Sequence, residues 1–295
     1  MILPHTLTVF RQLAIALCTL YCATALVSGE AEALSENPEL VAEAYGLFES
    51  GQTALALESF DQALKKDSSN LAARLGRAMA LLKQQRHEEA FEAYDLIVQR
   101  HPTHLFAWNG RGLAAFNLED FDEALNSFQH ATADQPVNGF FYESLAWTHF
   151  CRGDYAQATA AAKKATLMYH QSGETATYPL LIAYFSQLQG GQPDEARRTL
   201  SYAHNNKPAN QAWPTPIFDY LADRLSAEEL ISFVTDFAEE TEAHTYVGLH
   251  LRSLGKHEEA QRHLNWVAAK GDSRVFEQTL ARTLQAPEKV ALLTP

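Results

Sequence analysis

The chain has 295 residues, a hydrophobic fraction of 46%, and 36 acidic residues against 23 basic ones, which gives a net charge of −13. This composition is close to the globular average and excludes both a wholly disordered chain and a membrane protein with many spans. The negative charge repels phosphate groups, so a nucleic-acid partner is not expected.

The first predicted element is a short apolar segment near the N-terminus. Arg11 precedes an uncharged stretch over residues 12–27. A membrane-spanning helix needs about 20 apolar residues, whereas a secretion signal needs only about 7 to 15. We therefore expect residues 1–29 to be a signal helix that is cleaved after Gly29, or alternatively after Ala25, with export to the bacterial periplasm or secretion. The alternative is an uncleaved signal anchor that holds the protein on the membrane through residues 12–27.

Export would also change the cysteine content of the chain. Cys18 and Cys22 lie in the signal segment, so cleavage would leave only Cys151. A single cysteine cannot form an internal disulfide, so the stability of the mature protein must come from packing.

The rest of the chain is organised by a repeat of 34 residues. Small residues recur at this step in two series, which are Ala44, Ala78, Gly112, Ala146 and Ala56, Ala90, Ala124, Ala158. Larger residues keep the same step, as Phe60, Tyr94 and Phe128 do. Small residues where helices cross let the two backbones approach closely. Each unit is therefore expected to be a pair of antiparallel helices.

Turns between the paired helices are marked by glycine in two of the units. Gly51 and Gly153 stand at these turns, while Gln85 and Glu119 take the place of glycine in the other two. Glycine is favoured in tight turns because it has no side chain to oppose a left-handed backbone. The register of the repeat is expected to survive both replacements.

The period changes in the second half of the chain. The second-helix pattern returns at Ala196, which is 38 residues after Ala158, so about four residues are inserted near 171–174. We interpret this insertion as a longer loop. Ser226 followed by Glu229 is typical of a capping box that begins a helix. The amphipathic stretch over residues 274–284 would cover the end of the array.

The third unit carries the strongest family resemblance. Trp108 and Gly112 on its first helix, with Ala124, Phe128 and Ala131 on its second and Pro136 at its end, resemble the signature of the tetratricopeptide repeat (TPR). The resemblance implies an all-α fold, a right-handed α-solenoid or superhelix of antiparallel helix pairs. More loosely, the stretch from Phe218 to Gly248 is similar to exported bacterial TPR proteins of the envelope adaptor kind.

The repeat and this resemblance together divide the chain behind the signal segment. The predicted parts are TPR units 1 to 3 over residues 37–138, units 4 and 5 over 139–210, an irregular helix pair over 211–240, and a C-terminal unit with a capping helix over 241–286.

In TPR proteins the first helix of each unit lines the inner face of the superhelix. The resemblance therefore implies a groove for a partner with these residues: Tyr45, Phe48, Met79, Leu82, Phe106, Asn109, Phe116, Phe140, Trp147 and Phe150. Such an apolar surface suits an extended peptide, an amphipathic helix or a second copy of the chain in a homodimer. The alternative is that these side chains pack against the next unit or against the chain's own tail.

Sites for catalysis, metals and cofactors are not predicted. His87 and His257 each begin a His-Glu-Glu-Ala stretch, but neither has the second histidine of a zinc protease. Cys151 and His149 lie two residues apart on one helix and so face different ways. We therefore expect a non-catalytic scaffold or adaptor that binds a partner protein or peptide in the groove. The alternative is an accessory subunit or a degenerate enzyme, with a pocket that residues 211–240 form against the groove.

Overall fold

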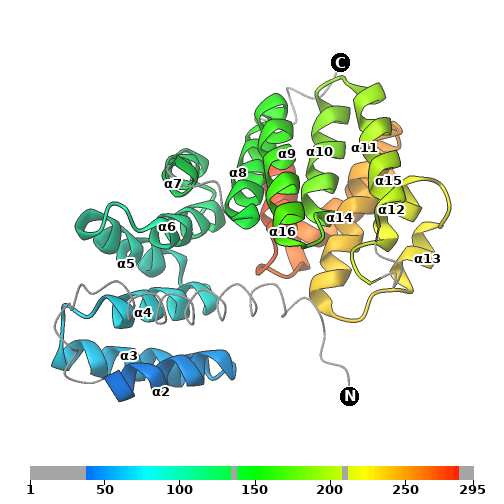
Figure 1. Ribbon diagram of the computed structural model, residues 1–295. Coiled ribbons are helices and arrows are strands. Elements are labelled where there is room, and N and C mark those ends of the chain that lie inside the picture. Colours follow the sequence, from blue (N-terminus) through cyan, green and yellow to red (C-terminus); the bar gives the residue numbers. More distant parts are fainter. Residues whose placement is uncertain (1–37, 134–137, 208–211, 286–295) are drawn as a thin grey trace. The chain divides into compact units, whose positions relative to one another are not determined.

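The computed structural model describes residues 38–133, 138–207 and 212–285. Within these ranges every regular element is a helix, and consecutive helices pack as antiparallel pairs (Figure 1). The all-α fold of helix pairs is therefore confirmed. The expected signal segment, residues 1–29, lies outside the described residues. None of the helices in the described part combines the length and the apolar character needed to cross a membrane.

The chain divides into two compact units, of which the first ends at Ala114 and the second begins at Ala115. The first unit holds α2 (Pro38–Glu49), α3 (Thr53–Lys66), α4 (Leu71–Lys83), α5 (His87–Arg100) and most of α6 (Leu105–Asn117). Its core runs along α2, α3 and α4 and includes Val41, Ala44, Phe48, Ala56, Phe60 and Leu81.

The second unit holds the end of α6 and all later helices. These are α7 (Phe121–Ala133), α8 (Gly139–Arg152), α9 (Tyr155–Ser172), α10 (Thr177–Gln189), α11 (Pro193–Asn205), α12 (Pro216–Leu221), α13 (Ala227–Ile231), α14 (Phe237–Ser253), α15 (His257–Lys270) and α16 (Phe276–Gln285). Helices α8 and α14 are buried along most of their length. In Figure 1 the last helix, α16, lies beside both of them, and it packs against both.

The 34-residue repeat reflects one contact between neighbouring pairs. A Cβ atom added to Gly76 would lie 2.2 Å from the Phe60 ring, and one added to Gly110 would lie 2.3 Å from the Tyr94 ring. At these two places the aromatic ring of a second helix lies so close to the first helix of the next pair that only glycine leaves room for it. The ring recurs at Phe128 with the period of the sequence, but the residue at the third such place is Ser144.

The turns within the pairs agree with the sequence analysis. Gly51 and Gly153 have φ angles of 82° and 85°, in the left-handed region. Gln85 and Glu119 adopt φ angles of 61° at the equivalent turns. Both replacements thus keep the backbone that glycine adopts elsewhere, although a side chain makes that backbone less favourable by roughly 1–2 kcal/mol.

The insertion near residues 171–174 is not a longer loop, and this expectation was wrong. Helix α9 has 18 residues, whereas α5 at the equivalent place has 14, so the extra residues extend the helix. Nothing in the sequence stops α9 before Gly173, which caps it with a φ angle of 77°. A glycine in this conformation is the usual end of a helix.

The irregular segment over residues 211–240 contains two short helices. Helix α13 begins with the expected capping box, in which the Glu229 backbone N–H donates to Ser226 Oγ at 3.1 Å. The Ser226 backbone N–H donates in return to Glu229 Oε2 at 2.7 Å. Trp213, at the start of the segment, donates its indole N–H to the Glu242 carboxylate at 2.6 Å and so ties the segment to α14.

Candidate partner-binding face

The predicted groove residues of the first unit lie partly in its core. Tyr45 donates its hydroxyl hydrogen to the Ala72 carbonyl at 2.8 Å, and its ring meets the edge of Phe60 at 4.9 Å. Phe48 is buried, and the Lys83 amino group lies 4.5 Å from the centre of its ring. These two aromatic residues therefore help to join neighbouring helices.

The remaining predicted residues of the first unit lie closer to its surface. Met79 and Leu82 are half-buried against the cores formed by α2 to α6. Phe106, at the start of α6, is 36% exposed. In this unit Phe106 therefore offers more apolar surface to a partner than any other predicted groove aromatic residue.

Asn109 on α6 is buried, and its Oδ1 atom has no hydrogen-bond partner among the described residues. An unsatisfied buried amide oxygen costs roughly 1–3 kcal/mol. Asn109 therefore does not present an exposed amide at the surface of the unit. Whether a partner satisfies this atom stays a prediction.

The predicted groove residues of the second unit gather around one residue of the last helix. Phe276 on α16 lies 4.9 Å from Phe116, 6.3 Å from Phe140 and 5.9 Å from Trp147, measured between ring centres. The planes of Trp147 and Phe276 are only 5° apart, so the two rings stack. Phe150 meets the edge of Trp147 at 6.3 Å and completes the cluster.

We call these residues the aromatic cluster: Phe116, Phe140, Trp147, Phe150 and Phe276. The first four are buried, whereas Phe276 is half-buried. In the second unit the side chains therefore pack against the chain's own C-terminal part, which was the alternative to a free groove. Their role toward a partner stays a prediction.

A group of buried acidic residues lies beside the aromatic cluster. Glu143 on α8, Glu242 on α14 and Glu277 on α16 are 7%, 3% and 2% exposed. We call them the buried glutamates. Tyr178 and Trp213 donate to Glu242 at 2.9 and 2.6 Å, and Tyr246 donates to Glu277 at 2.7 Å. In the described part of the chain, none of the three forms an ion pair with lysine or arginine.

Burial without a cation raises the pKa of each of these carboxyls, because the charged form loses its hydration. Burial raises the pKa of Glu143 to about 8, with the neighbouring Glu277 adding to the rise. The pKa values of Glu242 and Glu277 are also raised, mainly by burial. Hydrogen bonds from Tyr178, Trp213 and Tyr246 oppose the rise without cancelling it.

Only one of the buried glutamates has a position that follows from the repeat. Glu143 occupies the same place in its repeat as Asn109, 34 residues earlier, so its position on the inner face could be read from the period. Glu242 and Glu277 belong to the irregular C-terminal part and share no motif with Glu143. Only the fold brings the three together.

Two histidines of the second unit lie next to each other. His244 on α14 and His263 on α15 lie with their Nδ1 atoms 2.8 Å apart, which fits a hydrogen bond between two neutral rings. Burial lowers the pKa of both, so the neutral form is favoured. No group of three or more metal-ligating side chains occurs in residues 38–133, 138–207 and 212–285. Cys151 is a buried thiol.

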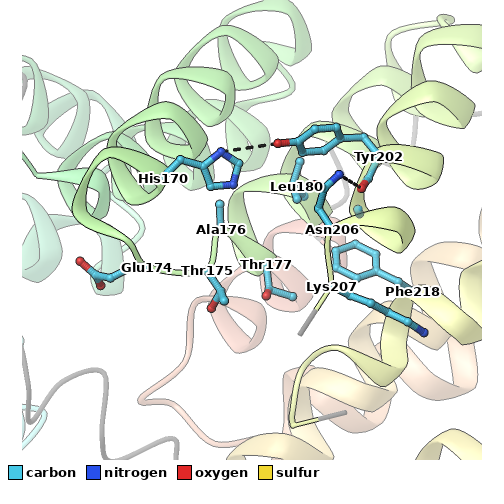
Figure 2. A pocket seen from close by; sticks show the side chains of 11 residues that line it. His170, Glu174, Thr175, Ala176, Thr177, Leu180, Tyr202, Asn206, Lys207 and Phe218 are labelled. Carbon is cyan, nitrogen blue, oxygen red and sulfur yellow. Dashed lines mark hydrogen bonds between the residues drawn. The ribbon is translucent and has the colours of Figure 1, made fainter. Parts of the chain in front are cut away.

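A cavity of about 330 Å³ lies where the end of α9 meets α10 and α11 (Figure 2). At one end of it the Tyr202 hydroxyl and the His170 Nδ1 atom are 3.5 Å apart. The Lys207 amino group is bound to the two Asp219 carboxylate oxygens at 2.6 and 2.5 Å. Phe218 is the lining residue that comes from the segment 211–240. Two of the polar side chains that line the cavity, His170 and Lys207, thus have partners.

Comparison with known proteins identifies the repeats. Residues 41–104 and 109–172 match the sequence model of the tetratricopeptide repeat. Among solved structures, the chain is similar to a tetratricopeptide repeat protein from Parabacteroides merdae, with a TM-score of 0.59 and 16% identity. That match covers 84% of this chain and 98% of the other. None of the curated protein sequences matches the chain.

The chain is also similar to structures of the protein MamA. One has a TM-score of 0.52 and 18% identity, over 59% of this chain and 93% of that one. Another, from Desulfovibrio magneticus, has a TM-score of 0.52 and 15% identity, over 58% and 94%. At these identities the likeness concerns the fold alone.

Proposed function

We propose that this chain, in which residues 41–104 and 109–172 match the tetratricopeptide repeat, is a non-catalytic scaffold that binds a partner protein or peptide through the inner face of its repeats. The observation that carries the proposal is the series of apolar and aromatic side chains on the first helices of successive units. A repeated apolar face suits an extended or helical segment of another protein.

The first unit supplies the part of this face that is most accessible. Phe106 is 36% exposed, and Met79 and Leu82 are half-buried near the surface of the same unit. The net charge of −13 favours a protein partner over nucleic acid. A second copy of the chain would satisfy the same requirements and is one outcome of the test below.

The cavity of Figure 2 does not support an enzymatic alternative. A catalytic residue needs a polar group that is positioned toward a substrate. Here His170 is bonded to Tyr202, and Lys207 is neutralised by Asp219. The segment 211–240 contributes Phe218 to the lining, which has no group that could transfer a proton or attack a substrate.

The test is photo-crosslinking inside the cells that produce the protein. Phe106 is replaced by p-benzoylphenylalanine, and Leu96, which is 51% exposed on the second helix α5, is replaced in the control. We expect a discrete adduct from position 106, identified by mass spectrometry, and none from position 96. Adducts from position 96 alone would place binding on the outer helices and contradict the proposal.

We further propose that the protein is exported and acts in the periplasm or outside the cell. The support is the uncharged stretch over residues 12–27 behind Arg11. Sequencing the N-terminus of the mature protein tests this proposal. A chain that begins at residue 30 or 26 is expected. An intact Met1 in a protein bound to membranes would instead identify a signal anchor.

A further inference from the structure

The last helix occupies part of the face that the proposed function assigns to a partner. Phe276, the first residue of α16, stacks on Trp147 of α8 and meets the edge of Phe116 on α6. Both contacted residues lie on first helices, at places predicted to face a ligand. The helix α16 therefore contacts this surface as a bound amphipathic helix would.

The contact between α16 and the rest of the second unit is unusually polar for a core. Glu277, Gln278, Thr279 and Thr283 are all buried on α16. The Gln278 side chain donates to the Ala268 carbonyl at 3.1 Å, but its Oε1 atom has no partner among the described residues. Contacts between parts that separate are more polar than permanent ones. The composition of this interface is therefore that of a separable contact.

The carboxyl of Glu277 weakens the contact between α16 and the rest of the second unit. It is 2% exposed, and the groups that face it are Tyr246 and Glu242 on α14, Glu143 on α8 and Tyr178 on α10. Arg282, the only other charged side chain in α16, binds Glu119 at 2.9 Å and the Asn117 carbonyl at 3.3 Å. Arg282 thus pairs with Glu119 and with none of the buried glutamates, whereas Glu277 lies among the other two.

From this arrangement we propose that α16 is an exchangeable internal ligand, and that a partner takes its place with an amphipathic helix whose aromatic residue is followed directly by a basic one. The inference rests on the proposed function. The aromatic residue stacks on Trp147 as Phe276 does. The basic residue takes the place of Glu277 and forms ion pairs with Glu143 and Glu242, which α16 itself cannot do.

Charge complementarity favours a partner helix with a basic residue at this place over a helix with the sequence of α16, which has Glu277 there. A third carboxyl beside two buried carboxyls must be protonated or repelled. A lysine or arginine at the same place would be paired on both sides, and breaking such a buried pair is strongly unfavourable. The partner helix therefore holds the face more tightly than α16 does.

Hydrogen exchange of the full chain tests whether α16 separates. In the wild type at pH 7, we expect amides of α16 to exchange through a local opening at least tenfold more often than amides of α8. Trp147 and the rest of α8 should stay protected during this opening. If α16 and α8 instead exchange together, only through global unfolding, α16 is a permanent part of the core and the proposal is wrong.

Peptide binding tests the chemistry of the partner. A fluorescent peptide with the sequence of residues 274–285 is titrated onto the full chain carrying Phe276→Ala, in which α16 has lost its stacking contact. The same peptide with Glu277→Lys is expected to bind at least tenfold more tightly, and the peptide with Phe276→Ala is expected not to bind. Equal affinity of all three peptides, or no binding by any, would overturn the proposal.

Two controls keep the outcomes distinct. The wild-type chain, whose face is covered, should bind the Glu277→Lys peptide more weakly than the variant chain does. The helix content of the variant is checked by circular dichroism, and the exchange experiment on the wild type stands even if the variant does not fold. Failure of the peptides together with adducts at position 106 would end this inference and leave the scaffold function intact.

Discussion

Single glycines decide how closely neighbouring helix pairs approach. Gly76 lies against the Phe60 ring, and Phe60 cannot move aside easily because it is fully buried and meets the edge of Tyr45. Interiors are packed densely, so an added methyl group is felt as strain. The same glycine and ring recur 34 residues later as Gly110 and Tyr94. At these two places the sequence repeat therefore reflects the same steric requirement.

We predict that Gly76→Ala destabilises the protein by roughly 1–3 kcal/mol, because the new Cβ atom overlaps the Phe60 ring. Gly46→Ala is the matched control, since it lies in α2 with no atom within 4 Å of an added Cβ. Alanine is favoured over glycine in a helix by about 1 kcal/mol, so the control should stabilise the protein. Urea unfolding measures both, and changes of the same sign would contradict the steric explanation.

Trp147 in the aromatic cluster and Phe106 in the first unit have different surroundings. Trp147 is 2% exposed, stacks on Phe276 and meets Phe150, whereas Phe106 in the first unit is 36% exposed. Two residues that the sequence assigned to the same groove therefore differ in what surrounds them. Their substitution should separate stability from binding.

At the scale of elements, we predict that Trp147→Ala lowers the free energy of unfolding by roughly 3–5 kcal/mol, the usual loss for a large buried aromatic residue. Phe106→Ala should lower it by less than about 1 kcal/mol, because little buried area is lost. Denaturant unfolding gives both values. It is followed by circular dichroism of the helices, because this signal does not depend on the tryptophan that is removed. Similar losses in the two variants would mean that Phe106 is also a core residue.

How far the elements follow from the sequence depends on whether the repeat reaches them. The helix pairs could be predicted because small residues must recur at every crossing, as Ala44 and Ala78 do. The length of α9 could not be predicted in this way. The residue count shows that about four residues are inserted, but not whether they lengthen the helix or the loop after it. Its continuation to Ser172 depends on the absence of a helix-breaking residue before Gly173.

The sequence predicts a helix at the position of α16, but it does not predict that this helix packs against α8. Its amphipathic pattern shows that one face is buried, but the pattern contains nothing about which surface buries it. Phe276 could equally have covered the last pair alone. The stacking on Trp147 results from the path of the chain through α12 to α15, a part that departs from the 34-residue period.

At the scale of the whole molecule, the buried glutamates make stability depend on pH in an unusual direction. A carboxyl whose pKa is raised by folding stabilises the protein fully below its unfolded pKa, and this contribution is lost as pH rises through the folded value. Glu143, with a pKa raised from 4.5 to about 8, belongs to this class, as do Glu242 and Glu277. Most proteins instead lose stability in acid, when paired carboxylates are protonated.

Other groups restrict the pH range in which this effect can be seen. Burial lowers the pKa of His104, His244 and His263, so their contribution grows as pH rises toward their unfolded value of 6.5. The pKa of Asp272 is lowered by its hydrogen bonds with Arg274, which outweigh its burial, so its contribution is lost only in acid. From pH 7 upward, the histidine and aspartate contributions are nearly constant. The buried glutamates then determine the slope.

We predict that the free energy of unfolding of the second unit falls by at least about 1.4 kcal/mol between pH 7 and 9, the equivalent of one pKa unit. Glu143→Gln should reduce this slope, because the amide does not ionise and the pKa of Glu143, about 8, lies inside this range. Exposed Glu258 on α15 provides the control, and Glu258→Gln should leave the slope unchanged. Urea unfolding across this range decides the matter. A stability that is constant or rises with pH in the wild type would show that the three carboxyls are not held protonated by burial.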